Sequence, residues 1–275
     1  MTTTEAPRKT GASLQFIDDT FQIHRTYSFG TKALKDTFGD KVEPLSVPAL
    51  FSENVLRRAW EMDCCVVLQH SHTEAGTPLT LRHLHDTRGN KDFLGGKFLY
   101  NTDWYKELPL FTEQTSRNGL FLKGRSLMPD STGKTFVGES LIGADFAERL
   151  FDNEMPEQYG AAIEELRTGA ERLEKLCGRD WQEGARQCVA LAFSRFFRES
   201  PVEVLYRVLL AQKVNRERLF EKTYTRTNIL SPDGCVVFVG SAGAHGARVN
   251  DWGPQAADGS LGFSFSCSGE LEAVV

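Results

Sequence analysis

The sequence contains no long hydrophobic run. Nowhere do about 18 apolar residues follow one another, which is the length a membrane-spanning helix needs. The first residues, MTTTEAPRKTGAS, contain no apolar core of the kind found in a secretory signal peptide. These absences predict a cytoplasmic protein without a membrane span.

Basic residues are not in excess either. The 275 residues include 32 Lys and Arg against 37 Asp and Glu, a formal net charge of −5. Proteins that bind nucleic acids through the phosphates need a basic surplus, so no nucleic-acid partner is expected. The six cysteines show neither CxxC spacing nor the pattern of a disulfide-rich scaffold. We expect reduced thiols that are buried as small hydrophobic side chains.

Motifs of common active sites are also missing. No GxSxG nucleophile elbow is present, and Gly133-Lys134-Thr135 resembles a phosphate-binding loop only at its end, because Met128 stands where the first glycine belongs. His70, His72, His83 and His85 lie close together, but no Cys or carboxylate completes a metal site at a suitable spacing. We therefore expect no metal and no cofactor, whereas a Cys/His pair that meets only in space stays open as an alternative.

The middle of the chain is predicted to be helical, over about residues 140–222. Apolar residues recur at helical spacing from Gly143 to Phe151 and again after Pro156. Asp180 is expected to cap a third helix, and Ser200-Pro201-Val202-Glu203 has the form of a capping box. Before this section we expect a helix from Ser52 and short strands at residues 64–68, 77–81, 97–100 and 119–123.

After about Tyr224 the character of the sequence changes. Eight glycines fall between Gly234 and Gly269, mixed with Val, Phe, Ser and Asn. Residues 236–239, 247–250 and 261–266 read as strands separated by Gly/Ser/Ala/Asp-rich loops. Apolar or glycine positions alternate here with side chains that share no chemistry, which is typical of a binding surface on a rigid scaffold rather than of a catalytic site.

The segments 233–240, 246–254 and 261–266 resemble the variable region of the target proteins of diversity-generating retroelements. Residues 96–106 and 200–206 resemble framework segments of the same proteins. The resemblance implies an α+β fold with a C-type-lectin-like antiparallel sheet of the formylglycine-generating-enzyme type. It further implies an N-terminal extension at residues 1–55 and a domain at residues 56–270, with the variable-type region at 233–266.

The resemblance implies a protein that binds an unknown protein or another macromolecular ligand through a hypervariable surface. The ligand-binding positions would be Phe238, Ser241, His245, Arg248, Asn250, Asp251, Gln255, Asp258 and Ser260. Trp252, Pro254 and Gly262 would be framework positions. Two alternatives stay open. One is an enzyme of the formylglycine-generating type, with Cys235 and Cys267 as the cooperating thiols, and the other is a purely structural intracellular protein.

Overall fold

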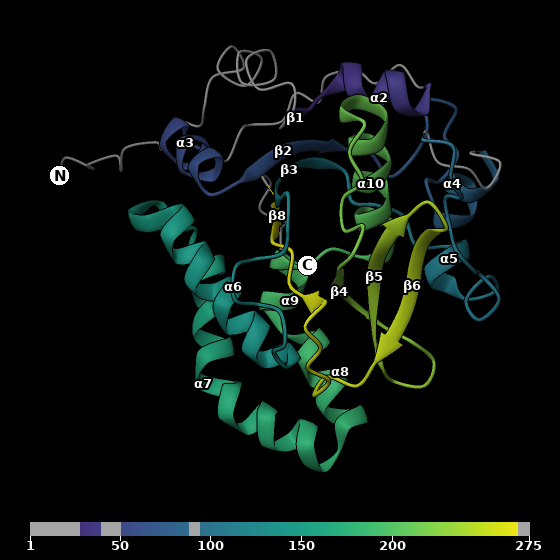
Figure 1. Cartoon of the computed structure of the whole chain (residues 1–275). Coiled ribbons are helices and arrows are strands. Elements are labelled where there is room, and N and C mark those ends of the chain that lie inside the picture. Colours follow the sequence, from purple (N-terminus) through teal and green to yellow (C-terminus); the bar gives the residue numbers. More distant parts are fainter. Residues whose placement is uncertain (1–27, 40–50, 88–93, 269–275) are drawn as a thin grey trace, which may run out of the picture.

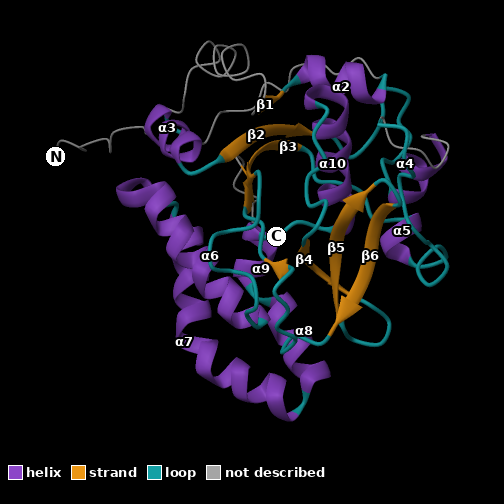
Figure 2. Ribbon diagram, viewed as in Figure 1, coloured by secondary structure: helices purple, strands orange, loops and turns teal. Residues whose placement is uncertain are grey.

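The computed structural model describes residues 28–39, 51–87 and 94–268 (Figure 1). They form two four-stranded sheets and a set of helices, so the predicted α+β class is confirmed. Figure 2 shows most of the helical section gathered on one side of the molecule and the β5–β6 hairpin on the other. Within the described residues, no helix is both long and apolar enough to cross a membrane.

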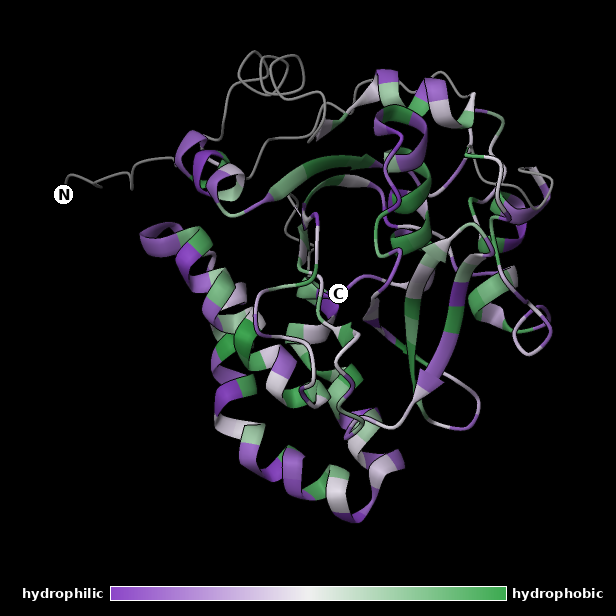
Figure 3. Cartoon of the chain, in the orientation of Figure 1, coloured by the Kyte–Doolittle hydropathy of each residue, from purple (hydrophilic) through white to green (hydrophobic). Residues whose placement is uncertain are grey.

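The first sheet has the strand order β1-β2-β3-β8. Its strands are β1 (Ser28–Phe29), β2 (Cys64–Gln69), β3 (Gly119–Gly124) and β8 (Ser266–Ser268). Every residue of β2 and β3 is buried, so both strands are covered on their two faces. In Figure 3 the ribbon of β2 is accordingly mostly green.

The second sheet has the order β6-β5-β4-β7. Its strands are β4 (Tyr224–Leu230), β5 (Val236–Gly243), β6 (Gly246–Trp252) and β7 (Leu261–Gly262). The expectation of purely antiparallel pairing is wrong in two places, because β7 pairs with β4 and β1 pairs with β2 in parallel. The predicted third strand at 261–266 is divided between the sheets, so that Phe263 and Phe265 are buried in the core that joins them.

The helical section covers residues 136–215 rather than 140–222. It consists of α6 (Phe136–Phe151), η1 (Asp152–Glu154), α7 (Glu157–Arg179), α8 (Trp181–Ala190), α9 (Ala192–Phe197) and α10 (Pro201–Asn215). The cap at Asp180 and the capping box of Ser200 with Glu203 are both present. The predicted third helix breaks at Leu191, whose ψ of 141° is extended, and α10 ends where Arg216 adopts a left-handed conformation.

In the described part of the chain, four further helices surround the sheets: α2 (Thr31–Phe38), α3 (Glu53–Glu61), α4 (Leu81–Thr87) and α5 (Pro109–Thr112). Ser52 caps α3 as predicted, whereas the strands expected at 77–81 and 97–100 are reduced to isolated bridges. Most of the predicted extension lies outside the described residues. The part that is described packs with the domain, since β1 pairs with β2 and α2 contacts α10.

Helix α10 is the centre of the fold. Its residues from Pro201 to Gln212 are all buried, which is typical of a helix covered all round. Arg207 of this helix shares the buried carboxylate of Glu199 with Lys123 of β3 and also donates to the Gly124 carbonyl. A buried charge is tolerated only when it is paired and hydrogen-bonded, so this cluster fixes α10 against the first sheet.

Candidate binding surface

The β5–β6 hairpin is the rigid support of the predicted variable-type region. The two strands pair in antiparallel register from Val236 opposite Trp252 to Gly240 opposite Arg248. One face of this hairpin is buried through Val237, Val239 and their neighbours. Because side chains alternate between the two faces of a strand, the buried face determines which side chains of β6 point to solvent.

Arg248, Asn250 and Trp252 occupy alternate positions of β6 and are exposed. They share a face with Phe238, which lies directly opposite Asn250 in the register. Phe238 is only 5% exposed, because the rings of Tyr224 and Trp252 pack on it at centroid distances of 5.2 and 5.6 Å. The prediction that Phe238 contacts a ligand is therefore wrong. Its buried ring instead packs against Trp252 and supports this exposed side chain.

A second segment, residues 96–104, lies along the outer edge of β6. Backbone hydrogen bonds of 2.9 Å join Tyr100 N to the Ala247 carbonyl and Ala247 N to the Phe98 carbonyl, and the indole Nε1 of Trp104 donates to the Val249 carbonyl at 3.0 Å. Pairing of this kind covers the edge of the sheet. Gly246 permits the close approach, because a Cβ there would lie 2.5 Å from the Tyr100 nitrogen.

This segment adds aromatic side chains to the surface that the sequence did not assign to it. Tyr100 is 48% exposed and Trp104 38% exposed, and the Arg248 guanidinium lies over the Tyr100 ring at 4.5 Å. The sequence did contain a signal, because residues 101–106 are at once aromatic and polar. We define the β6 surface as Tyr100, Trp104, Arg248, Asn250 and Trp252.

The other predicted ligand-binding positions differ in exposure. His245 and Gln255 are exposed, whereas Ser241, Asp251, Asp258 and Ser260 are half-buried. The Asp258 carboxylate accepts hydrogen bonds from the backbone nitrogen and the hydroxyl of Ser260, which hold its pKa below the usual range. The polar groups of these two side chains therefore bond to each other within the turn and are less available for contacts with a ligand.

The three predicted framework positions divide in a similar way. Pro254 is buried and its carbonyl accepts from the Phe136 nitrogen at 2.8 Å, while Gly262 is buried in β7. Trp252 was predicted as framework alone, yet it is 46% exposed. Part of its indole packs on Phe238 and the rest faces solvent, so Trp252 is both a framework residue and an exposed residue of the β6 surface.

Buried charged side chains fix the backbone of the loop that follows β6. Arg226 of β4 donates to the carbonyls of Lys134 and Ala256 and pairs with the Glu139 carboxylate. Arg198 also donates to Glu139, at 3.3 and 3.4 Å. A single buried carboxylate thus compensates two buried guanidinium groups, one of which anchors the backbone of the loop at Ala256.

The two thiols proposed for an enzyme of the formylglycine-generating type are not brought together. Cys267 pairs with Leu122 in the first sheet, whereas Cys235 precedes β5 in the second, and both are free. Burial raises the pKa of Cys267 far above its usual value, and the smaller burial of Cys235 also raises its pKa. Both thiols are therefore protonated near neutral pH and are poor nucleophiles.

The four neighbouring histidines do not share one face of a strand. β2 ends at Gln69, before His70, and His83 and His85 lie on α4, where positions i and i+2 point in different directions. The described residues contain no group of three His, Cys, Asp or Glu side chains placed to hold a metal ion. Gly133-Lys134-Thr135 leads into α6, whose N-cap is Thr135.

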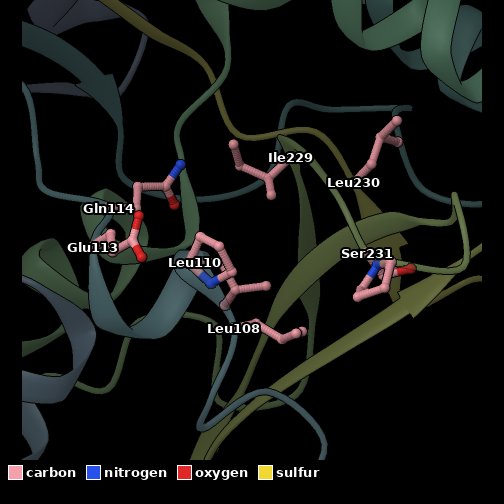
Figure 4. Close-up of a pocket in the computed structure, with 9 residues that line it drawn as sticks. Leu108, Leu110, Glu113, Gln114, Ile229, Leu230 and Ser231 are labelled. Atoms are coloured by element: carbon pink, nitrogen blue, oxygen red, sulfur yellow. The ribbon is translucent and has the colours of Figure 1, made fainter.

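An open groove of about 580 Å³ lies between α5 and the end of β4 (Figure 4). Leucine, isoleucine and proline side chains make up most of its lining, and Glu113 and Gln114 stand on the α5 side. Among its lining residues Glu113 is the one titratable group. The groove therefore offers no acid–base pair for catalysis.

No family model, curated protein or solved structure matches this chain. The resemblance to a C-type-lectin fold and to retroelement target proteins stays a prediction from the sequence.

Proposed function

We propose that this protein binds a macromolecular partner through the β6 surface and the adjoining exposed residues His245 and Gln255. The observation that carries the proposal is the exposure of three large aromatic side chains on β6 and on the segment bonded to its edge, Trp252, Tyr100 and Trp104, together with Arg248 over the Tyr100 ring. Aromatic residues and arginine dominate the binding energy of protein interfaces. Three large aromatic side chains half open to solvent, on a backbone fixed by hydrogen bonds, suit that role.

The backbone that carries these side chains, and the chemistry of their neighbours, favour a binding role over a catalytic one. The backbone of β6 is paired with β5 along most of its length and is bonded on its outer edge at Ala247 and Val249, so the surface is pre-organised and little ordering is needed when a partner binds. The neighbouring side chains include one arginine, two amides and one imidazole, but the Cys235 thiol next to the hairpin is protonated near neutral pH. Pre-organised aromatic and polar side chains without an activated nucleophile are the chemistry of a binding site.

We further propose that a retroelement diversifies the exposed positions of this surface. In that case the DNA around the gene contains a reverse transcriptase and a near copy of the 3′ segment that differs at adenines. Binding and diversification are separate claims, since a fixed β6 surface would bind one partner equally well.

Binding is tested by probing the purified chain against arrays of proteins and glycans. A ligand of the β6 surface is expected to lose at least about tenfold in affinity with Arg248→Ala and with Trp252→Ala, since each is a residue type that dominates interfaces. Arg179→Ala, which removes an exposed arginine at the end of α7, serves as the matched control and should bind as the unaltered chain does. Ligands that respond equally to all three substitutions would contradict the proposal.

A further inference from the structure

Two buried cysteines face each other where α7 meets α8. The Sγ atoms of Cys177 and Cys188 are 3.8 Å apart, and the two side chains are 2% and 0% exposed. Among the cysteines, all of which lie in the described part of the chain, no other two sulfur atoms are in hydrogen-bonding contact. Both were expected simply to fill the core as small hydrophobic side chains.

The two helices approach closely because Gly184 lies between them. A Cβ at this position of α8 would lie 2.7 Å from both the Cα and the Sγ of Cys177. Cys188 follows one helical turn after Gly184, so its thiol is on the same side of α8. The sulfur atoms therefore need to move by less than about 2 Å to reach the S–S distance of a disulfide.

We propose that Cys177 and Cys188 form a reversible dithiol that a hydroperoxide converts into an intramolecular disulfide. The Cys177 thiolate attacks one peroxide oxygen, the O–O bond breaks, and hydrogen peroxide releases one water to leave a sulfenic acid on Cys177. The Cys188 sulfur then attacks the sulfenic sulfur, the S–O bond breaks, and a second water carries away the Cys188 proton. The two thiols are oxidised and the peroxide is reduced.

The two thiols differ in a way that suits these two roles. The hydrogen bond from Cys188 lowers the pKa of the Cys177 thiol, which makes Cys177 the attacking sulfur. The same hydrogen bond, together with burial, raises the pKa of Cys188. Cys177 also lies in the last turn of α7, next to the exposed Gly178 and Arg179, so local opening of this helix end admits a small peroxide.

The disulfide would fix the junction of α7 and α8, which contacts the turn between β4 and β5. The side chain of Gln182, at the start of α8, donates to the Asp233 carbonyl at 2.9 Å and packs against Gly234. The new bond closes a short loop through this junction, which restricts the unfolded chain. We expect the oxidised protein to unfold at a midpoint roughly 5 °C above that of the reduced protein.

The test treats the full reduced chain with stoichiometric hydrogen peroxide. The expected product has lost two hydrogen atoms, and trypsin releases residues 176–179 joined to residues 187–195, a pair that dithiothreitol separates. Cys177→Ser and Cys188→Ser should each abolish the joined pair. Cys65→Ser, which removes another buried thiol, should leave it unchanged.

Oxidation that spares both residues while Cys235 reacts would overturn the proposal. So would joined peptides that involve Cys64 or Cys267 in place of this pair. An oxidised product that unfolds at the same or a lower midpoint than the reduced chain would show that the fold does not accommodate the bond. The Cys235→Ser chain is measured in parallel, and there the joined peptides should form as in the unaltered chain.

Discussion

Replacement of Glu139 by glutamine is expected to be among the most destabilising conservative substitutions in this chain. The Glu139 side chain is 0% exposed and is the carboxylate shared by Arg198 and Arg226, which are 0% and 1% exposed. Glutamine keeps the shape but removes the charge, and it turns an amide toward guanidinium groups that can only donate. Two buried cations then lack a counter-charge.

The expected cost is roughly 3–5 kcal/mol, the range for breaking a buried pair by altering one partner. Other contacts of Arg198, to the Ser140 hydroxyl at 2.9 Å and over the Phe136 ring at 3.9 Å, remain and set the lower end of that range. A loss of this size is a large fraction of the total stability of a domain. It should also loosen the loop after β6, because Arg226 holds the Ala256 carbonyl.

Urea unfolding followed by circular dichroism measures this cost. Glu148→Gln is the matched control, because it makes the same change on the same helix in a surface pair, where Glu148 and Arg167 have side chains 46% and 37% exposed. Surface pairs contribute about 0–1 kcal/mol, so the control should change little. A Glu139→Gln chain that loses no more stability than the control would refute the account of the buried cluster.

Two further predictions concern the buried carboxylate of Glu203 and the backbone of Gly246. Burial alone would raise the pKa of Glu203, but the charges of Arg117 and Lys123 and hydrogen bonds from Arg117 and Ser200 outweigh it and lower the pKa from 4.5 to about 2. A depressed folded-state pKa stabilises the fold above the unfolded value, so about 3 kcal/mol should be lost as the pH falls from 4.5 to about 2. Urea titrations over that range should show this loss, which Glu203→Gln should reduce; an equal loss in both chains would argue against it. Gly246→Ala forces a side chain onto a φ of +100° and against Tyr100. It should cost about 2 kcal/mol or more and speed amide exchange at Tyr100, whereas unchanged exchange would show that segment 96–104 does not depend on this contact.

Local signals in the sequence predict the helical section well. The residues that begin and end its helices act within one turn of themselves, as Asp180 and Ser200 do, so their effect does not depend on the rest of the fold. The division of residues 261–266 between two sheets was not predictable in the same way. Which sheet Leu261 and Ser266 join depends on partners far away in the chain, Tyr224 and Lys123.

The exposed side of β6 could be predicted only in part, because burial also depends on distant residues. Alternation along β6 correctly places Arg248 and Asn250 on the exposed side. It also places Phe238 on that side, and only the packing of Tyr224 and Trp252 buries its ring. The contribution of Tyr100 could not be found from spacing, because it arises from pairing with a strand almost 150 residues further along the chain.

We infer that β6 and the adjoining residues His245 and Gln255 present side chains whose identity the fold does not require. The most direct test of this inference is a library in which His245, Arg248, Asn250 and Gln255 are randomised, with folded chains recovered by resistance to protease. A second library randomises Phe238, Val239 and Val249 on the same hairpin, which are buried.

We predict that most variants of the exposed set retain stability within about 0.5 kcal/mol, as is usual for surface positions. Polar or truncated variants of the buried set should lose about 2–5 kcal/mol and be removed by the protease. Equal depletion of the two libraries would show instead that the fold depends on the exposed set.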